Sequence, residues 1–144
     1  MTESQEKSGQ VTALIYADGG SRGNPGPAGC GVVITNQATG EVLGNISHFL
    51  GNTTNNVAEY TGLVMGLEKV LDLGIDHVEA RMDSELVVKQ IKGEYRVKNE
   101  NLKPLYAKAV ALKGKFKKFA ISHVRREQNK EADRLANQAM DRGA

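Results

Sequence analysis

Residues 11–20 have the sequence Val-Thr-Ala-Leu-Ile-Tyr-Ala-Asp-Gly-Gly, a nearly unbroken apolar run that ends in an aspartate and two glycines. Such a run is typical of a strand that is buried on both faces at the centre of a sheet. We therefore predict a central strand over Val11–Asp18. Asp18 is its unusual member, because a carboxylate at the end of a buried strand needs a partner or a cation. No basic residue lies within three positions of it.

Four further strands are predicted downstream of the first. The segment Asn24–Pro27 is rich in proline and glycine, and we expect it to be a loop. Ala28–Asn36 and Glu41–Leu50 follow, and with the first strand they are expected to form an antiparallel meander. His77–Met82 and Lys117–Val124 are predicted strands that come after helical segments.

Helical periodicity precedes and follows these later strands. Gly74 and Gly93 are expected to end the first two helices, and Leu86, Val87 and Ile91 are expected to face inward from the second. The predicted N-caps, in chain order, are Thr54 or Asn55, Asp83 or Ser84, Asn101, and Asn129. The order of three strands, helix, strand, two helices, strand and helix predicts an α/β fold, with a mixed sheet flanked by helices.

The length of 144 residues suits one domain with its own core. We place this domain at residues 11–140, between a disordered N-terminal tail at 1–10 and a short C-terminal tail at 141–144. The single cysteine, Cys30, excludes an internal disulfide, and no apolar run approaches the roughly 20 residues that span a membrane. The N-terminus lacks the apolar segment of a signal peptide, so we expect a cytoplasmic protein without a membrane partner. We also expect a monomer.

The net charge of +2 is unevenly distributed along the chain. Residues 89–126 hold 12 Lys and Arg against two acids, whereas the rest of the chain holds 7 basic and 15 acidic residues. Taken alone, a basic run is more often a solvated surface than a binding site. The alternative is a seat for a polyanion beside a region where acids serve another purpose.

Four acidic residues fall at predicted strand ends or in the first turns of predicted helices: Asp18, Glu59, Asp83 and Asp133. Sites in α/β sheets form at the carboxyl ends of strands and at neighbouring helix N-termini. Taken singly, Glu59 and Asp133 could stabilise a helix dipole and Asp83 could be an N-cap. If the four converge, their mutual repulsion favours divalent cations, and Mg²⁺ prefers such oxygen ligands. Two ions about 3.5–4 Å apart activate water and stabilise the leaving oxygen of a phosphodiester.

Other chemistries have weaker support in the sequence. No phosphate-binding loop ending in Gly-Lys-Ser/Thr is present, and no serine lies in a nucleophile-elbow motif. His48, His77 and His123 lack the spacing of zinc ligands, and a single cysteine makes no thiolate site.

Four local motifs point to one family. Residues 16–29, Tyr-Ala-Asp-Gly-Gly-Ser-Arg-Gly-Asn-Pro-Gly-Pro-Ala-Gly, resemble the first-strand motif of type 1 ribonucleases H. Residues 54–59 (Thr-Asn-Asn-Val-Ala-Glu), 82–87 (Met-Asp-Ser-Glu-Leu-Val) and 123–133 (His-Val-Arg-Arg-Glu-Gln-Asn-Lys-Glu-Ala-Asp) resemble the other three acidic motifs. All four occur in order on the expected elements, and the resemblance covers about Val11–Met140. It is closest to the compact bacterial and archaeal variety that lacks a basic handle.

The resemblance implies the ribonuclease H-like fold, with a five-stranded mixed sheet whose later strands run parallel to the first. It also implies an endonuclease that hydrolyses the RNA strand of RNA–DNA hybrids with two Mg²⁺ ions, for which Mn²⁺ can substitute. The products would carry 5′-phosphate and 3′-hydroxyl ends. In the family scheme Asp18 contacts both ions, Glu59 and Asp83 hold the ion on the leaving-group side, and Asp133 holds the ion that activates water.

The resemblance further implies a set of substrate contacts. Asn24, Asn55 and Asn56 match positions that contact RNA 2′-hydroxyls, the groups by which a protein distinguishes RNA from DNA. Thr54 and Asn99 match a pocket for a DNA phosphate. Turn and cap chemistry is the alternative for these residues, and for Asn24 the sequence by itself favours it.

Two departures from the family pattern affect the expectations. Relatives often have a histidine in the loop before the last acid, whereas this loop contains Arg125, Arg126, Glu127 and Gln128, and Arg126 or Glu127 is our guess for a substitute. The chain also has no Trp and no room for a basic handle helix. The DNA strand would then be gripped by Lys89, Lys92, Arg96 and Lys98, with Tyr95 as a further candidate, in weak and salt-sensitive binding.

Two other functions remain open at this point. A non-catalytic hybrid-binding module could retain the fold, but it would not need four acids facing a polyanion. A resolvase or 3′ exonuclease of the same fold would show different acid motifs. The sequence also leaves open a fused second domain and activity on double-stranded RNA.

Overall fold

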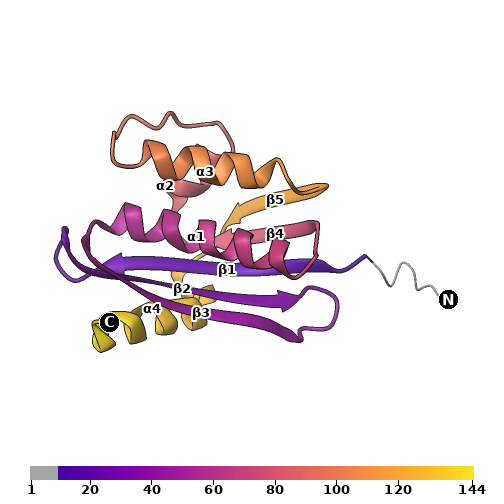
Figure 1. Cartoon of the computed structure of the whole chain (residues 1–144), viewed down its shortest axis with the longest axis horizontal. Coiled ribbons are helices and arrows are strands. Elements are labelled where there is room, and N and C mark those ends of the chain that lie inside the picture. The colour runs from indigo at the N-terminus through magenta and orange to yellow at the C-terminus, as the bar shows by residue number, and fades with distance from the viewer. Residues whose placement is uncertain (1–9) are drawn as a thin grey trace.

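β1 (Thr12–Ser21) is the central strand of a five-stranded sheet in the computed structural model, which describes residues 10–144. The strand order is β3-β2-β1-β4-β5, with β1, β2 and β3 antiparallel and with β4 and β5 parallel to β1 (Figure 1). The other strands are β2 (Gly26–Asn36), β3 (Val42–Thr53), β4 (His77–Met82) and β5 (Lys118–His123). This mixed sheet confirms the predicted α/β fold. The predicted disordered tail falls almost wholly on residues 1–9, outside the described part.

Helices cover both faces of the sheet (Figure 1). α1 (Asn55–Asp72) packs against β1 and β2, with α2 (Glu85–Ile91) and α3 (Lys103–Lys113) beside it. α4 (Lys130–Arg142) follows a 3-10 turn, η1 (Arg126–Gln128), and packs on the opposite face against β2, β1 and β3. α4 continues two residues beyond the predicted domain end at Met140. None of the helices within residues 10–144 combines the length and apolar character that crossing a membrane requires.

The interface between α4 and the sheet is built from very small residues. Gly29 and Gly31 of β2 face α4, and a Cβ atom at Gly31 would overlap the carbonyl oxygen of Ala132. Ala132, Ala136 and Ala139 on the helix side are buried, as the periodicity of the last helix predicts. α4 therefore lies directly on the backbone of β2, which brings its first turns close to β1.

The hairpin of β1 and β2 is longer than predicted. β1 continues through Gly19 and Gly20 to Ser21, and these residues pair with Cys30, Gly29 and Ala28 of β2. The predicted loop Asn24–Pro27 is consequently wrong at its end, because Gly26 and Pro27 belong to β2. The backbone N–H of Arg22 donates to Pro27 O at 2.8 Å and closes the turn. Cross-strand pairing outweighs the turn preference of glycine and proline here.

Helix starts show which capping predictions hold. Thr54 caps α1 and Ser84, not Asp83, caps α2, each through a side-chain oxygen that accepts a backbone N–H three residues on. The prediction for Asn101 is wrong, because α3 starts after Leu102 and Asn101 N–H donates instead to Asn99 Oδ1. Asn129 precedes α4, but its side chain makes no capping hydrogen bond.

Candidate active site

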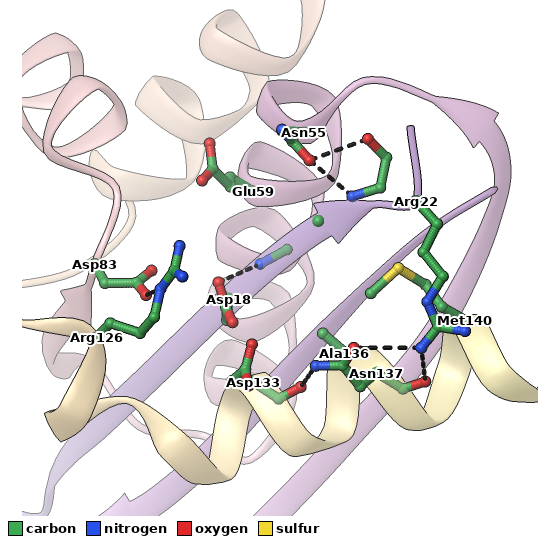
Figure 2. Close-up of a pocket in the computed structure, with 13 residues that line it drawn as sticks. Asp18, Arg22, Asn55, Glu59, Asp83, Arg126, Asp133, Ala136, Asn137 and Met140 are labelled. Carbon is green, nitrogen blue, oxygen red and sulfur yellow. Dashed lines mark hydrogen bonds and ion pairs between the residues drawn. The ribbon is translucent and has the colours of Figure 1, made fainter. Parts of the chain in front are cut away.

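The four predicted acids line one cavity of about 320 Å³ (Figure 2). Asp18 lies near the carboxyl end of β1, Asp83 directly follows β4, Glu59 lies in the second turn of α1, and Asp133 lies in the first turns of α4. Because β1 and β4 are parallel, their carboxyl ends meet at the same edge of the sheet. The close packing of α1 and α4 on the two faces of β1 supplies the other two carboxylates.

Gly19 allows Glu59 to approach Asp18. A Cβ atom at Gly19 would overlap the backbone of Ala58 and Glu59, so α1 can lie this close to β1 only because this position has no side chain. The backbone N–H of Gly19 also donates to Asp18 Oδ1 at 2.9 Å. One glycine therefore sets both the distance between two acids and the orientation of the first.

The site is electrostatically unfavourable for its own carboxylates. The pKa of Asp18 is raised to about 8, mainly by burial and further by the charge of Asp83 and by the hydrogen bond and charge of Asp133, while the hydrogen bond from Gly19 N–H lowers it. Burial likewise raises the pKa of Glu59 to about 7, where a hydrogen bond from Ser84 opposes the shift and the charge of Asp83 adds to it. Near neutral pH the cavity therefore favours a bound positive charge.

The donor set fits a hard divalent cation. All four groups are carboxylates, which are the ligands that Mg²⁺ and Mn²⁺ accept. Their present rotamers are not closed around an ion, since no three Asp, Glu, His or Cys side chains in residues 10–144 are placed to hold one together. The charged neighbour that the fold supplies is Arg126, whose Nε lies 3.9 Å from Asp83 Oδ2, and its side chain is 87% exposed. Such a solvated cation offsets little of the buried negative charge.

Comparison with known proteins places this site in a family. The Reverse transcriptase-like family profile matches residues 16–139. Ribonuclease HI of Halobacterium salinarum is 40% identical over 136 residues, which cover 94% of this chain and 67% of that protein. The chain belongs to the ribonuclease H family.

Solved structures of two ribonucleases H have the same fold as this family member. The N-terminal ribonuclease H domain of a bifunctional Mycobacterium tuberculosis protein is 47% identical, with a TM-score of 0.89 over 91% of this chain and 100% of that domain. LC11-RNase H1, solved in complex with an RNA/DNA hybrid, is also 47% identical, with a TM-score of 0.85 over 90% and 97% of the two chains. This ribonuclease H chain spans 37% of the length of the whole mycobacterial protein.

Two of the asparagines predicted to contact substrate join the β1–β2 turn of this ribonuclease H to α1. Asn55 Oδ1 accepts hydrogen bonds from Ser21 N at 2.7 Å and Ser21 Oγ at 3.0 Å (Figure 2). Asn24 Oδ1 accepts from Asn55 N at 3.1 Å. The bond that Asn24 accepts comes from a residue 31 positions away, so it joins the turn to α1 and is not a bond within the turn. Within residues 10–144 the Nδ2 groups of both have no partner, so each amide can still donate to a ligand.

The remaining predicted contacts lie apart from the acids. Thr54 Oγ1 is used as the α1 cap, and Asn56 follows it in the first turn of the helix. Lys89 on α2 pairs with Glu85 at 3.2 Å and lies 4.9 Å from the centre of the Tyr95 ring. The others follow α2 on an exposed loop: Lys92, Arg96, Lys98 and Asn99. None of these five residues of α2 and its loop lines the acidic cavity.

Two arginines line the cavity wall, and one of them, Arg22, was not predicted as a site residue. Arg22 Nη2 donates to Asn137 Oδ1 at 3.3 Å (Figure 2). Its Nη1 pairs with Asp141 Oδ1 at 2.6 Å, and the two contacts hold the turn against α4. Arg22 is the basic residue within the glycine-rich motif, a signal that sequence reasoning could have used. Arg126, our guess for the missing histidine, also lines the cavity, and Glu127 does not.

Proposed function

We propose that this ribonuclease H is a metal-dependent endonuclease that hydrolyses the RNA strand of RNA–DNA hybrids and leaves 5′-phosphate and 3′-hydroxyl ends. The observation that carries the proposal is the convergence of four carboxylates on one cavity, two of them with pKa values raised by burial. The relative LC11-RNase H1, which was solved with an RNA/DNA hybrid, supports the choice of substrate. We further propose that the protein acts as a cytoplasmic monomer.

The carboxylates would hold two Mg²⁺ or Mn²⁺ ions, with Asp18 at the centre of the set. Bound there, the ions supply a nucleophilic water and stabilise the leaving 3′-oxygen. The chain's own contribution is to fix the four carboxylates on β1, β4, α1 and α4 and to keep Asp18 away from bulk water. Since its side chain is nearly buried, solvent screens Asp18 poorly, and a bound cation would favour its ionised form against the raised pKa.

Recognition of the hybrid is assigned to two separate surfaces. The free Nδ2 groups of Asn24 and Asn55 would donate to 2′-hydroxyls of the RNA strand, as would Asn56, and Asn55 lines the same cavity as the acids. Thr54 and Asn99 are proposed to contact a DNA phosphate. Lys89, Lys92, Arg96 and Lys98 would attract the backbone of the DNA strand through charge.

The test is cleavage of an end-labelled RNA–DNA hybrid with Mg²⁺ or Mn²⁺ by wild type and by Asp18→Asn, beside double-stranded RNA, a junction and single strands. We expect wild type to cut the RNA strand of the hybrid and the variant to bind it with at least about a thousandfold less cleavage. If wild type binds the hybrid but does not cut it with either metal, this proposal is wrong and the hybrid-binding module becomes the better explanation.

A further inference from the structure

Asn129 is a buried polar residue with an unusual set of contacts. It lies between η1 and α4, its side chain is 1% exposed, and its Oδ1 has no hydrogen-bond partner. Within residues 10–144 it holds the one buried side-chain nitrogen or oxygen atom left without a partner. Burial of an unpaired amide oxygen is unfavourable. The other contacts of Asn129 must therefore explain why an asparagine is buried at this position.

Those contacts join the segments that carry two of the acids. Asn129 Nδ2 donates to Ala17 O on β1 at 2.9 Å, across 112 positions of sequence, and Ala17 immediately precedes Asp18. The backbone oxygen of Asn129 accepts the N–H of Asp133 at 3.1 Å. Asn129 is thus one hydrogen bond from Ala17, the chain neighbour of Asp18, and one hydrogen bond from Asp133.

We propose that Asn129 is a positioning residue that fixes Asp133 relative to Asp18, an inference that rests on the proposed function of the acids. The surrounding contact between α4 and β2 consists of alanines on glycines, which allows close approach but gives no directional bond. The hydrogen bond from Asn129 to Ala17 O is a directional bond of this kind, and it lies at the end of α4 nearest the cavity. Figure 2 shows the result, with Asp133 pointing from α4 toward Asp18.

Helix capping does not explain the burial of Asn129. A capping asparagine accepts a backbone N–H of the first helical turn through its side-chain oxygen, whereas this one has no such bond. A side chain that only filled space would need no donor, and an aspartate of the same shape would place a further negative charge beside Asp18. The carboxamide is the short side chain that donates to a carbonyl without adding charge.

Asn129→Ala is the direct test, and Ser47→Ala is its matched control. Ser47 Oγ donates to Leu135 O at 2.7 Å, so the control also removes a side-chain bond between the sheet and α4, but away from the four acids. We expect Asn129→Ala to lower kcat for the hybrid by about 10- to 100-fold with KM changed less than about twofold. Calorimetric titration with Mn²⁺ alone should show affinity weakened by about tenfold. Ser47→Ala should retain both values.

Asn129→Ser separates positioning from capping and serves if the alanine variant does not fold. Serine can cap α4 but is too short to replace the bond to Ala17 O, so we expect it to recover stability without recovering kcat or Mn²⁺ affinity. Recovery of both by Asn129→Ser, or equal losses in Asn129→Ala and Ser47→Ala, would overturn the inference. If wild type does not cleave, the proposed function fails, and Mn²⁺ titration of the three variants still decides the role of Asn129.

Discussion

The acidic end of the sheet and the basic loop after α2 differ in how their side chains are held. Around the acids, glycine contacts, the Asn55 and Asn24 bonds and the Asn129 bond join β1 to α1 and α4. In the basic loop Lys92, Arg96 and Lys98 are exposed. Rigid placement suits groups that must hold ions at fixed separations, and loosely held charges suffice to attract a polyanion. Changes in the first region should therefore lower kcat, and changes in the second should alter binding.

Among substitutions that leave the four acids unchanged, the largest effect is expected from Gly19→Ala in the rigid region. The added methyl group overlaps the backbone of Ala58 and Glu59, so α1 must move away from β1. We expect a loss of about 1–3 kcal/mol in the free energy of unfolding and a fall in kcat of about a hundredfold. Urea unfolding and hybrid cleavage measure both.

Gly20→Ala is the matched control for that substitution. A Cβ atom there has no neighbour closer than 3.8 Å, and its φ is not positive. Equal loss of activity in the two variants would show that flexibility of the strand end, not the approach of Glu59, explains the effect.

An intermediate effect is expected on stability as a function of pH and metal. Because folding raises the pKa of Asp18 to about 8 and of Glu59 to about 7, the stability that these two groups contribute to the metal-free protein is fully present below their unfolded pKa values and is lost as pH rises toward 8. Saturating Mn²⁺ should then raise Tm by roughly 5 °C or more at pH 8, and by less at pH 5. Thermal unfolding at both pH values measures it.

Asp18→Asn is the control for the pH prediction. It removes the carboxylate that burial destabilises most, so the metal-free variant should be more stable than wild type at pH 8 and should gain less from Mn²⁺. A metal-free wild type whose Tm rises between pH 5 and 8 would contradict the assignment of raised pKa values.

The smallest effect is expected in the basic loop. Arg96→Ala and Lys98→Ala should each raise KM for the hybrid by a few-fold and lower the slope of log affinity against log salt by about one, with kcat unchanged. Lys108→Ala is the control, since Lys108 is paired with Glu68 at 3.2 Å on α1 and lies outside the loop. If affinity for the hybrid stays constant between about 50 and 200 mM salt, the basic loop does not bind the DNA strand through charge.

Local signals explain what the sequence could predict. Apolar runs and helical periods predicted the five strands and the four α-helices but not the 3-10 turn η1. The motifs around Asp18, Glu59, Asp83 and Asp133 identified the acids that line one cavity. These features depend on neighbours within a few positions. The extended β1–β2 hairpin was missed because cross-strand partners outweigh local turn preference.

Contacts distant in sequence explain what could not be predicted. The bond of Asn129 to Ala17 and the ion pair of Arg22 with Asp141 each join opposite ends of the chain. Leu86, predicted to face inward, is 37% exposed, whereas Val88 is buried. α2 has seven residues, so its period alone does not fix which face the neighbouring elements cover.

The positions of the four acids along the chain also determine when the active site can be completed during protein synthesis. The first acid is on the first strand, and the last is on a helix that starts at Lys130. A nascent chain that ends before this helix already holds Asp18, Glu59 and Asp83 but not the fourth carboxylate. Cleavage competence should therefore arise in one late step, when α4 docks on the glycines of β2, and nascent chains on the ribosome should not cleave RNA–DNA hybrids until then.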